Sequence, residues 1–416
     1  MNPPWLWRAG LVVAWGGAVA VLTLQPGDLD PGRLSGLDAG CLVCGSRGAA
    51  DAVLNVGFFT PLGLALGGSA RAVPGAFLVG AAISFVIELA QTAVPGRHGG
   101  IADVLWNGTG AALGALLFGL LRRRMRSHPG PTPPLRGAAP WLAGAGIVLL
   151  GTGSLAAPAP TPGDYWVLFT PRLGVDPAYD GSVVEARIAG RLVGHGPLDR
   201  RPEVRSALER RSWSVTARIV VGTPPRPVLP VVLLGDPAIA GEVVLVGVHR
   251  GDVVVRERRR STELRFDTPD VRLAGALADV PRGDTVSLRI ERAGTRLRLA
   301  VDEGPFVETG LTVGRGWGFL AYLEGAGEAG RRALDLLWLA MLFVPAGFFA
   351  PTGRQAATTA AGAVVLTGVA GWLTPFRAAL PAELLASALG VLAGVAALRL
   401  ARRFLPPAQE RVPTPD

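Results

Sequence analysis

Three consecutive apolar stretches of the chain carry carboxylate, amide and hydroxyl side chains at helical spacing. The polar residues are Asp51 and Asn55 in the first of these stretches, Ser84, Glu88 and Gln91 in the second, and Asp103 and Asn107 in the third. Residues four and seven apart share one face of a helix, so each stretch presents its polar groups as a stripe. Because ionisable side chains are costly inside a membrane, such a stripe indicates function. Glu88 could exchange a proton with a substrate that the amides and the hydroxyl bind.

The three stripes are expected to meet at one boundary of the membrane. Asp51 and Asp103 open their stretches, whereas Glu88 lies near the end of its own, so antiparallel helices bring them to the same side. We therefore predict an outward polar cavity in which Glu88 and Asp103 are the catalytic candidates. The predicted substrate-binding residues are Asp51, Asn55, Ser84, Gln91, Arg97 and Asn107. Together with Asp103, the guanidinium of Arg97 would position an anionic head group.

The same residues also fit a purely structural role. Asp51 and Asp103 could cap helix N-termini, where free N–H groups and the helix dipole stabilise acids. The amide and hydroxyl side chains could form interhelical hydrogen bonds that hold the bundle together. Glu88 fits this interpretation least, because an ionised carboxylate at its position needs a partner or a proton.

The elements that must position these residues are membrane-spanning helices. The chain has 416 residues, of which 49% are hydrophobic and 18% charged, whereas soluble domains carry about a quarter charged residues. Eight apolar stretches approach the length needed to cross a hydrocarbon core of ~30 Å: residues 6–24, 53–70, 75–94, 104–121, 138–157, 333–351, 356–374 and 381–398. The first is interpreted as an uncleaved span, because no convincing small-residue cleavage site follows it.

The positive charge of the chain indicates how these spans are oriented. The net charge is +9, and the arginines concentrate at the ends of apolar stretches rather than on a folded surface, which argues against nucleic-acid binding. Arginine-rich loops stay in the cytoplasm. We therefore predict a multi-pass protein of the bacterial inner (plasma) membrane, with both termini cytoplasmic and residues 158–328 extracytoplasmic.

Motifs in the first four stretches resemble the VanZ-like membrane proteins. They are Asp51-x3-Asn55 followed by Phe59-x-Pro61-Leu62-Gly63, then Ser84-x3-Glu88-x2-Gln91, then Arg97-x5-Asp103-x3-Asn107-x2-Gly110. The resemblance covers about residues 1–125 and implies an integral membrane protein of a family whose namesake is linked to resistance against the glycopeptide teicoplanin. One position departs from the family pattern, since an acidic residue often seen between the Arg and the Asp of the last motif is Gly100 or a neighbour here.

Cys41 and Cys44 form a Cys-x2-Cys pair in the loop before the second stretch. A zinc ribbon would need a second pair, and the chain has 2 cysteines, so no metal site is predicted. Outside the membrane the two thiols could form a local disulfide or stay free. A catalytic redox role would require a thioredoxin-like setting, which the sequence does not offer.

Between the fifth and sixth stretches the pattern changes to short alternating segments typical of β-strands. The predicted strands are residues 165–170, 182–188, 212–221, 231–234, 242–248, 252–255, 264–266, 285–291, 296–301 and 316–322. Regular turn signals between them predict an all-β sandwich of jelly-roll type. The hairpin 285–302, which turns at Ala293-Gly294-Thr295, resembles that of concanavalin A-like and laminin G-like domains. This resemblance implies a module that binds glycans or proteins and sometimes hydrolyses glycans.

The hydrolase alternative for the sandwich lacks its carboxylates. Glycoside hydrolysis needs two acidic residues across the scissile bond, and the Glu-x-Asp-x2-Glu run usual in hydrolases of this fold is missing. Trp166, Trp213 and Trp317 could stack on a sugar, although such residues more often fill a sandwich core. The cluster of residues 256–260 is interpreted as a solvated strand edge that deters pairing. A binding module is therefore the favoured interpretation.

The sequence thus predicts a polytopic α-helical membrane protein of about eight spans with an inserted jelly-roll sandwich. Its expected parts are a VanZ-like four-helix membrane unit (1–125), a cytoplasmic linker with the fifth span (126–157), the extracytoplasmic sandwich (158–328), three C-terminal spans (329–403) and a cytoplasmic tail (404–416). The last three spans hold Asp335 and Glu383 but show no organised polar face, so they are interpreted as packing and anchoring helices.

The predicted role is that of a VanZ-like cell-envelope protein, linked to glycopeptide resistance, whose sandwich binds an envelope glycan or surface protein near the polar cavity. The alternative is a membrane enzyme or transporter that acts on a lipid-linked envelope precursor through Glu88 and Asp103. The predicted partners are the lipid bilayer and that glycan or protein, with no cofactor and no nucleic acid. Whether the protein catalyses a reaction is left open.

Overall fold

A computed structural model describes most of the chain. The described residues are 10, 15–17, 19, 41–68, 71–94, 99–126, 135, 137–159, 165–174, 176–198, 202–210, 212–236, 241–321, 323 and 327–404. Two compact units make up the chain, one formed by Met1–Thr132 with Pro406–Asp416 and the other by Pro133–Leu405. The predicted span 6–24 lies largely outside the described residues, and Arg97 lies outside them altogether.

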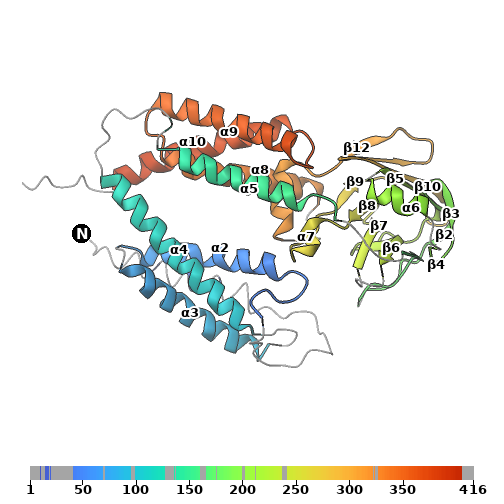
Figure 1. Ribbon diagram of the computed structural model, residues 1–416, viewed down its shortest axis with the longest axis horizontal. Coiled ribbons are helices and arrows are strands. Elements are labelled where there is room, and N and C mark those ends of the chain that lie inside the picture. Colours follow the sequence, from blue (N-terminus) through green and yellow to red (C-terminus); the bar gives the residue numbers. More distant parts are fainter. Residues whose placement is uncertain are drawn as a thin grey trace, which may run out of the picture. The chain divides into compact units, whose positions relative to one another are not determined.

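The described part of the first unit consists of helices α2 (Gly48–Leu66), α3 (Ala72–Gln91) and α4 (Ile101–Arg126) (Figure 1). Each of the three contains a window long and apolar enough to cross a membrane. Helix α4 packs against both α2 and α3. A Cβ atom added to Gly63 of α2 would lie 1.9 Å from the backbone oxygen of Ala111 on α4. The two backbones therefore touch where only glycine fits, as is common between membrane helices.

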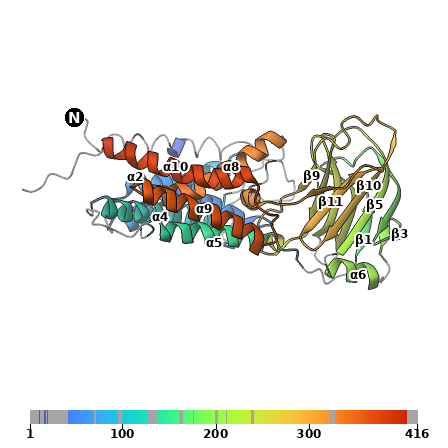
Figure 2. The ribbon, with the colours of Figure 1, turned by 90° about the horizontal axis from the view of Figure 1, so that it is seen from above.

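The second unit contains four long helices and an inserted β domain. The helices are α5 (Ala139–Leu155), α8 (Glu328–Phe348), α9 (Gly353–Leu373) and α10 (Pro381–Phe404). Helix α10 packs against α8 and α9, and α5 packs against α8 and α9. Thr352 and Gln355 form a capping box that fixes the start of α9. The β domain follows α5 in the chain and ends before α8 (Figures 1 and 2).

Five helices of the described chain qualify as membrane spans: α2, α3, α4, α9 and α10. The predicted count of about eight is not reached for two physical reasons besides the incompletely described first stretch. Helix α5 is apolar but only 17 residues long. Helix α8 begins at Glu328, before the predicted span 333–351, and so carries Glu328, Arg331 and Arg332 in its first half in addition to Asp335.

The β domain is a sandwich of two six-stranded sheets with antiparallel pairing throughout. The first sheet has the order β4-β1-β6-β7-β8-β9, with β1 (Trp166–Phe169), β4 (Gly196–Pro197), β6 (Leu229–Asp236), β7 (Gly241–His249), β8 (Asp252–Glu257) and β9 (Val271–Leu273). The second has the order β12-β11-β10-β5-β2-β3, with β2 (Ser182–Ile188), β3 (Arg191–Val193), β5 (Ser212–Val220), β10 (Thr285–Ala293), β11 (Arg296–Val301) and β12 (Val307–Thr309). Two short helices, α6 (Pro202–Glu209) and α7 (Arg260–Glu263), lie in its connections.

Alternating burial in the second sheet explains why its strands were predictable. Along β10, buried residues alternate with partly exposed ones, which places Leu288 and Ile290 in the core. The predicted hairpin is confirmed, since β10 pairs with β11 in a register that sets Ala293 opposite Arg296. Gly294 takes the positive φ of 59° at the turn.

Two predicted strands are wrong. Residues 264–266 form no strand and follow helix α7. The segment predicted as the strand 316–322 instead contributes to a 3-10 helix, η2 (Val313–Phe319), which packs against α5, α8 and α9. Local apolar spacing could not distinguish a strand from a segment that is buried against helices.

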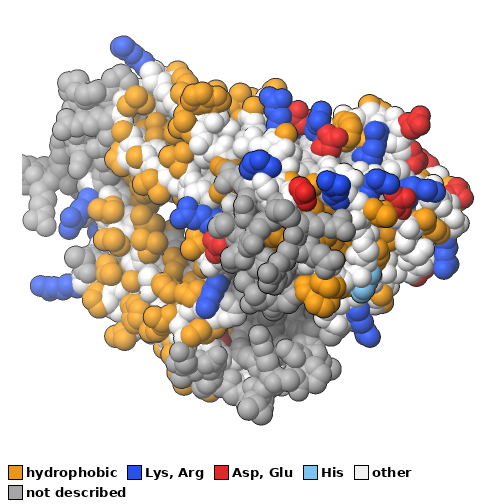
Figure 3. All heavy atoms as spheres, turned by 45° about the vertical axis from the view of Figure 1, so that its right-hand side comes forward, with side chains coloured by type: hydrophobic (Ala, Val, Ile, Leu, Met, Phe, Trp, Pro, Cys, Tyr) orange, Lys and Arg blue, Asp and Glu red, His pale blue; other side chains and the backbone are white. Residues whose placement is uncertain are grey.

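The sandwich and the helices of the second unit share one hydrophobic core. The buried cluster runs from sandwich residues such as Val246 through Phe319 of η2 to Leu149 on α5 and Phe343 on α8. The sandwich lies at one end of these helices (Figure 2). On the face shown in Figure 3, hydrophobic side chains gather over the helices, and arginine and acidic side chains gather over the sandwich. The β domain is therefore built into the helical unit rather than tethered to it.

Candidate functional site

The polar stripes of α2, α3 and α4 converge because glycines let these helices approach closely. A Cβ on Gly110 would lie 2.3 Å from the Val56 oxygen, and one on Gly114 would lie 2.0 Å from the Thr60 oxygen, both on α2. On the other side of α4, a Cβ on Gly80 of α3 would lie 2.6 Å from the Ala111 side chain. This close packing brings the side chains near the start of α4 within hydrogen-bonding distance of both neighbours.

Asn55 and Asp103 form the contact between α2 and α4. The Asn55 side-chain amide donates to Oδ1 of Asp103 over 2.6 Å. Asp51, one turn before Asn55, is exposed and lies close enough to Asp103 for their carboxylates to repel each other. Arg47 acts electrostatically on Asp51 from the residue before α2. The sequence analysis did not single out Arg47, although its i, i+4 spacing from Asp51 was visible.

Ser84 and Asn107 form the matching contact between α3 and α4. The Asn107 side-chain amide donates to the Ser84 hydroxyl over 2.8 Å, and both residues are buried. Asn107 is 6% exposed, yet its Oδ1 atom has no hydrogen-bond partner among the described residues. A buried carbonyl oxygen without a partner is costly, so this atom marks a place where a donor could bind.

Glu88 is 3% exposed and contacts the backbone that leads into α4. Its Oε2 accepts a hydrogen bond from the Gly100 N–H over 2.8 Å. Gly100 directly precedes α4, so the carboxylate satisfies a donor at the entry to that helix. Gln91 is buried one turn further along α3. The geometry thus gives Glu88 a positioning role at the start of α4.

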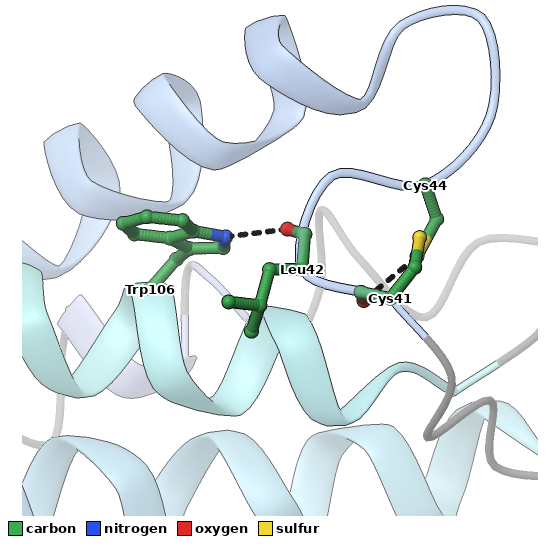
Figure 4. The surroundings of a disulfide bond; sticks show 4 residues. All are labelled: Cys41, Leu42, Cys44 and Trp106. Carbon is green, nitrogen blue, oxygen red and sulfur yellow. Dashed lines mark hydrogen bonds between the residues drawn. A yellow bond between two sulfur atoms is a disulfide. The ribbon is translucent and has the colours of Figure 1, made fainter.

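A disulfide loop precedes α2. Cys41 and Cys44 are joined with an S–S distance of 2.07 Å (Figure 4). Between them, the backbone oxygen of Leu42 accepts a hydrogen bond from the Trp106 indole over 2.9 Å. Trp106 lies on α4 between Asp103 and Asn107, so the loop is held to the helix that carries the polar cluster. In the described chain, no group of three or more His, Cys, Asp or Glu side chains could hold a metal ion.

A second polar cluster lies in the other unit, and the sequence analysis did not foresee it. Glu383 of α10 is 2% exposed, and its Oε1 accepts from the Gly314 N–H over 2.9 Å. Asp335 of α8 accepts from the Trp317 indole over 2.7 Å and lies 3.3 Å from Nε of Arg315. Gly314, Arg315 and Trp317 all belong to η2. The expectation that the last helices lack an organised polar face is therefore wrong.

The cluster of residues 256–260 is also not a solvated edge. Glu257 is 5% exposed, and its Oε2 lies 3.1 Å from Arg259 Nη2 and 3.2 Å from Arg292 Nη1. Arg259 Nη1 also donates to the Ala156 oxygen, just after α5, over 2.8 Å. Burial lowers the pKa of Arg259 to about 10, so the guanidinium stays charged at neutral pH. These charges pair inside the unit instead of facing water.

The three tryptophans considered as a sugar platform do not share one exposed surface. Trp213 is 6% exposed within the sandwich core, and Trp317 donates to Asp335 of α8. Trp166 of β1 is exposed. Stacking of one sugar across all three side chains is therefore excluded.

The buried ion cluster predicts a large stability effect. Replacing Glu257 by Gln removes the negative charge between two buried guanidinium groups, so we expect a loss of about 3–5 kcal/mol in the free energy of unfolding. The surface pair of Glu291 and Arg298 provides the control, because Glu291→Gln should cost at most about 1 kcal/mol. Thermal unfolding of both variants in detergent measures the difference, and equal melting temperatures would contradict it.

These features define a class: a membrane protein whose spanning helices carry a polar cluster and whose second helical unit holds an antiparallel β-sandwich. Comparison with known families gives a match to the VanZ/LLP1 family for residues 26–122. The matched segment covers α2, α3 and most of α4, so this part of the chain is similar to the VanZ/LLP1 family. No curated protein and no solved structure matches the chain.

Proposed function

We propose that this VanZ/LLP1 protein is a ligand-binding protein of the bacterial cell envelope. Its binding site is the polar cluster of α2, α3 and α4, and its sandwich is an extracytoplasmic module for a glycan or surface protein. The observation that carries the proposal is the 2.6 Å contact of Asn55 with the Asp103 carboxylate, together with the exposed Asp51 one turn before Asn55. The family match adds the link to glycopeptide resistance as part of the proposal.

The charge pattern supports an outward orientation for this site. Helix α4 ends in the run Arg122-Arg123-Arg124, and α10 carries Arg402 and Arg403 near its end. Basic residues favour the cytoplasmic side, so the opposite ends of these helices face outward. Asp51 and Asp103 lie in the first turns of their helices, at the ends opposite these arginines, which supports a position at the outer boundary of the inner membrane.

The sandwich supports the envelope role through its size and surface. It has two six-stranded sheets, and arginine and acidic side chains gather on the face seen in Figure 3, with hydrophobic side chains between them. A concanavalin A-like jelly roll remains our proposal for its topology. Because its core continues into η2 and α8, ligand binding should be measured on the full chain rather than on an isolated sandwich.

A membrane enzyme or transporter is the second candidate. The two neighbouring carboxylates Asp51 and Asp103 favour it, since such a pair could take up and release a proton while handling a lipid-linked precursor. In that case Glu88 would be a second proton carrier. The two functions differ in whether Glu88 must ionise or only accept the hydrogen bond from Gly100.

A complementation experiment separates these functions. A strain that lacks the protein would express the wild type, Asp103→Asn or Glu88→Gln and be challenged with teicoplanin, with membrane levels of each protein quantified. We expect Asp103→Asn to protect no better than the empty strain, because the carboxylate that faces the ligand loses its charge. Glu88→Gln keeps an acceptor oxygen for the Gly100 N–H and should protect fully.

The outcomes are decisive for each function. Asp279→Asn is the matched control, because that carboxylate is exposed on the sandwich and should not affect protection. Loss of protection with Glu88→Gln as well would favour the enzyme or transporter. Full protection by Asp103→Asn at normal protein levels would contradict the binding site, and a wild type without protection would contradict the glycopeptide link.

A further inference from the structure

Helix α8 repeats the sequence pattern of α2. At the start of α2 an Arg-x3-Asp pair, formed by Arg47 directly before the helix and Asp51 within it, precedes Pro61-x-Gly63. In α8 the corresponding residues are Arg331, Asp335, Pro345 and Gly347 at identical spacing. Two residues before each proline stands a buried phenylalanine, Phe59 or Phe343.

Helix α10 repeats α4 in the same way. The pattern Asp103-x3-Asn107-x2-Gly110-x3-Gly114 becomes Glu383-x3-Ser387-x2-Gly390-x3-Gly394. Each position keeps its chemical character: an acid, then a hydrogen-bonding side chain, then two glycines. Both helices also end in paired arginines, at Arg122-Arg123 and Arg402-Arg403.

The helix contacts match pair by pair. A Cβ on Gly63 would lie 1.9 Å from the Ala111 oxygen, and one on Gly347 would lie 1.9 Å from the oxygen of Val391, the residue equivalent to Ala111. A Cβ on Gly114 would lie 2.0 Å from the Thr60 oxygen, and one on Gly394 would lie 2.1 Å from that of Val344, again the equivalent residue.

The middle helices of the two units, α3 and α9, also match each other. The 2.8 Å hydrogen bond between Asn107 and Ser84 has its counterpart in the 2.8 Å bond between Ser387 and Thr367 of α9. The buried faces of the two helices share one spacing, with Ala76, Gly80, Ser84, Ile87 and Glu88 on α3 and Thr359, Ala363, Thr367, Ala370 and Gly371 on α9. In both units the third helix packs against the other two (Figure 1).

We infer that α8, α9 and α10 form a second VanZ-like unit. By this equivalence, Asp51 and Asp103 of the first unit bind a cationic group with N–H donors. Such a group is what η2 presents to Asp335 and Glu383 in the second unit. This inference rests on the proposed function, because it names the ligand chemistry of the same site. It also assigns a role to η2, which occupies the equivalent site of the second unit, at Asp335 and Glu383, with part of the chain itself.

The second unit displays what its carboxylates bind. Asp335 receives the Trp317 indole N–H and the Arg315 guanidinium, and Glu383 receives the Gly314 backbone N–H. Every donor from η2 is an N–H group, and one of them is cationic. Carboxylates form their strongest hydrogen bonds with such charged donors.

The first unit has the same carboxylates with fewer donors among the described residues. Among those residues, the Asp103 carboxylate receives a hydrogen bond from Asn55, and Leu339 replaces that asparagine in the second unit. Asp51 is exposed, whereas Asp335 is 8% exposed. Asn107, one turn below Asp103, keeps an oxygen without a partner in the described chain. Two carboxylates and a carbonyl oxygen are acceptors, so they favour a donor-rich cation over an anionic ligand.

The probe for this site is a labelled peptide with the sequence of η2, Val-Gly-Arg-Gly-Trp-Gly-Phe, blocked at both ends. Fluorescence anisotropy would measure its binding to the full-length protein in nanodiscs of phosphatidylglycerol. We expect binding by the wild type that weakens at least tenfold in Asp51→Asn and in Asp103→Asn. A peptide with citrulline in place of arginine should bind at least tenfold more weakly, and Asp279→Asn should bind like the wild type.

A second arm identifies the source of the cation. Phosphatidylethanolamine in the nanodisc carries an ammonium group with N–H donors, whereas phosphatidylcholine carries a cation without them. If phosphatidylethanolamine but not phosphatidylcholine displaces the peptide, the ligand is a lipid head group. If neither lipid displaces the peptide, the ligand is a soluble amine or guanidinium compound.

Several results would overturn the inference. They are no peptide binding by the wild type, unchanged binding by Asp103→Asn, and loss of binding in Glu383→Ala but not in Asp103→Asn. The proposed function is judged separately by complementation. If Asp103→Asn loses protection but still binds the peptide, the ligand class is wrong and the binding site stands. If it loses the peptide but still protects, the ligand class stands and the site is not the one on which protection depends.

Discussion

Gly114→Leu and Gly394→Leu are each expected to disrupt the helical unit that contains the substitution. A Cβ at Gly114 would lie 2.0 Å from the Thr60 oxygen and 2.8 Å from the Leu64 nitrogen, and one at Gly394 would lie 2.1 Å from the Val344 oxygen and 2.6 Å from the Phe348 nitrogen. These are backbone atoms, so no side-chain rotation relieves the overlap. The helices must separate, and the packing that holds them in the membrane is lost.

The expected cost is at the upper end for overpacking, about 3 kcal/mol or more, which lowers the melting temperature by about 10 °C or more. Thermal unfolding in detergent measures this effect. Gly119→Leu on α4 and Gly151→Leu on α5 are the matched controls, because an added Cβ at either position meets nothing within 4 Å. If the controls lose as much stability as the test variants, close helix contact is not the reason.

Similar losses of stability in Gly114→Leu and Gly394→Leu would support the internal repeat, because the same helix contact would be disrupted in each unit. The comparison is informative because Gly114 and Gly394 take equivalent places in their helices. A large loss for one variant and none for the other would show that the two units depend on different contacts.

The polar contacts of the first unit could be predicted because they follow helical periodicity. Asn55, Ser84, Asp103 and Asn107 recur at spacings that place them on one helical face, and antiparallel helices bring those faces together. The specific pairs, Asn55 with Asp103 and Ser84 with Asn107, depend on the helix register that the glycines set. This register is set by the packing of the helices against one another, so it cannot be predicted from the spacing of residues within one helix.

The second polar cluster was missed for a related reason. Leu339 stands where α2 has Asn55, and Gly371 stands where α3 has Glu88, so the polar stripes are incomplete. The partners of Asp335 and Glu383 come from η2, a segment outside the helices. The repeated spacing of acid, proline and glycine was nevertheless present in the sequence, and a search for internal repeats would have found it.

Errors in the sandwich have the same origin in tertiary context. The apolar pattern of residues 316–322 suits a strand, but the helices of the second unit bury this segment as η2. The charges of residues 256–260 suit an exposed edge, but Arg292 of β10 lies 3.2 Å from Glu257, and Ala156 accepts a hydrogen bond from Arg259. Charged side chains can be buried when segments distant in the sequence supply their counter-charges.

Removing the Glu383 carboxylate is expected to release η2 from the polar cluster that Asp335 and Glu383 form in the second unit. Glu383 accepts the Gly314 N–H through Oε1 and the Leu380 N–H through Oε2, so Glu383→Ala leaves one buried and one partly buried donor without this acceptor. Each costs about 1–3 kcal/mol, which corresponds to an increase of about tenfold to a hundredfold in amide hydrogen exchange at Gly314.

Hydrogen exchange of the full-length protein in nanodiscs measures this release at residues 313–319. Glu383→Gln retains one acceptor oxygen and should exchange at an intermediate rate. Asp279→Asn, a change at an exposed carboxylate, should leave the exchange of η2 unchanged. If η2 exchanges as slowly in Glu383→Ala as in the wild type, the contacts of Phe319 and the shared core hold the segment without the carboxylate. The η2 segment would then be a structural connector, and its match to a ligand of the first unit would lose its support.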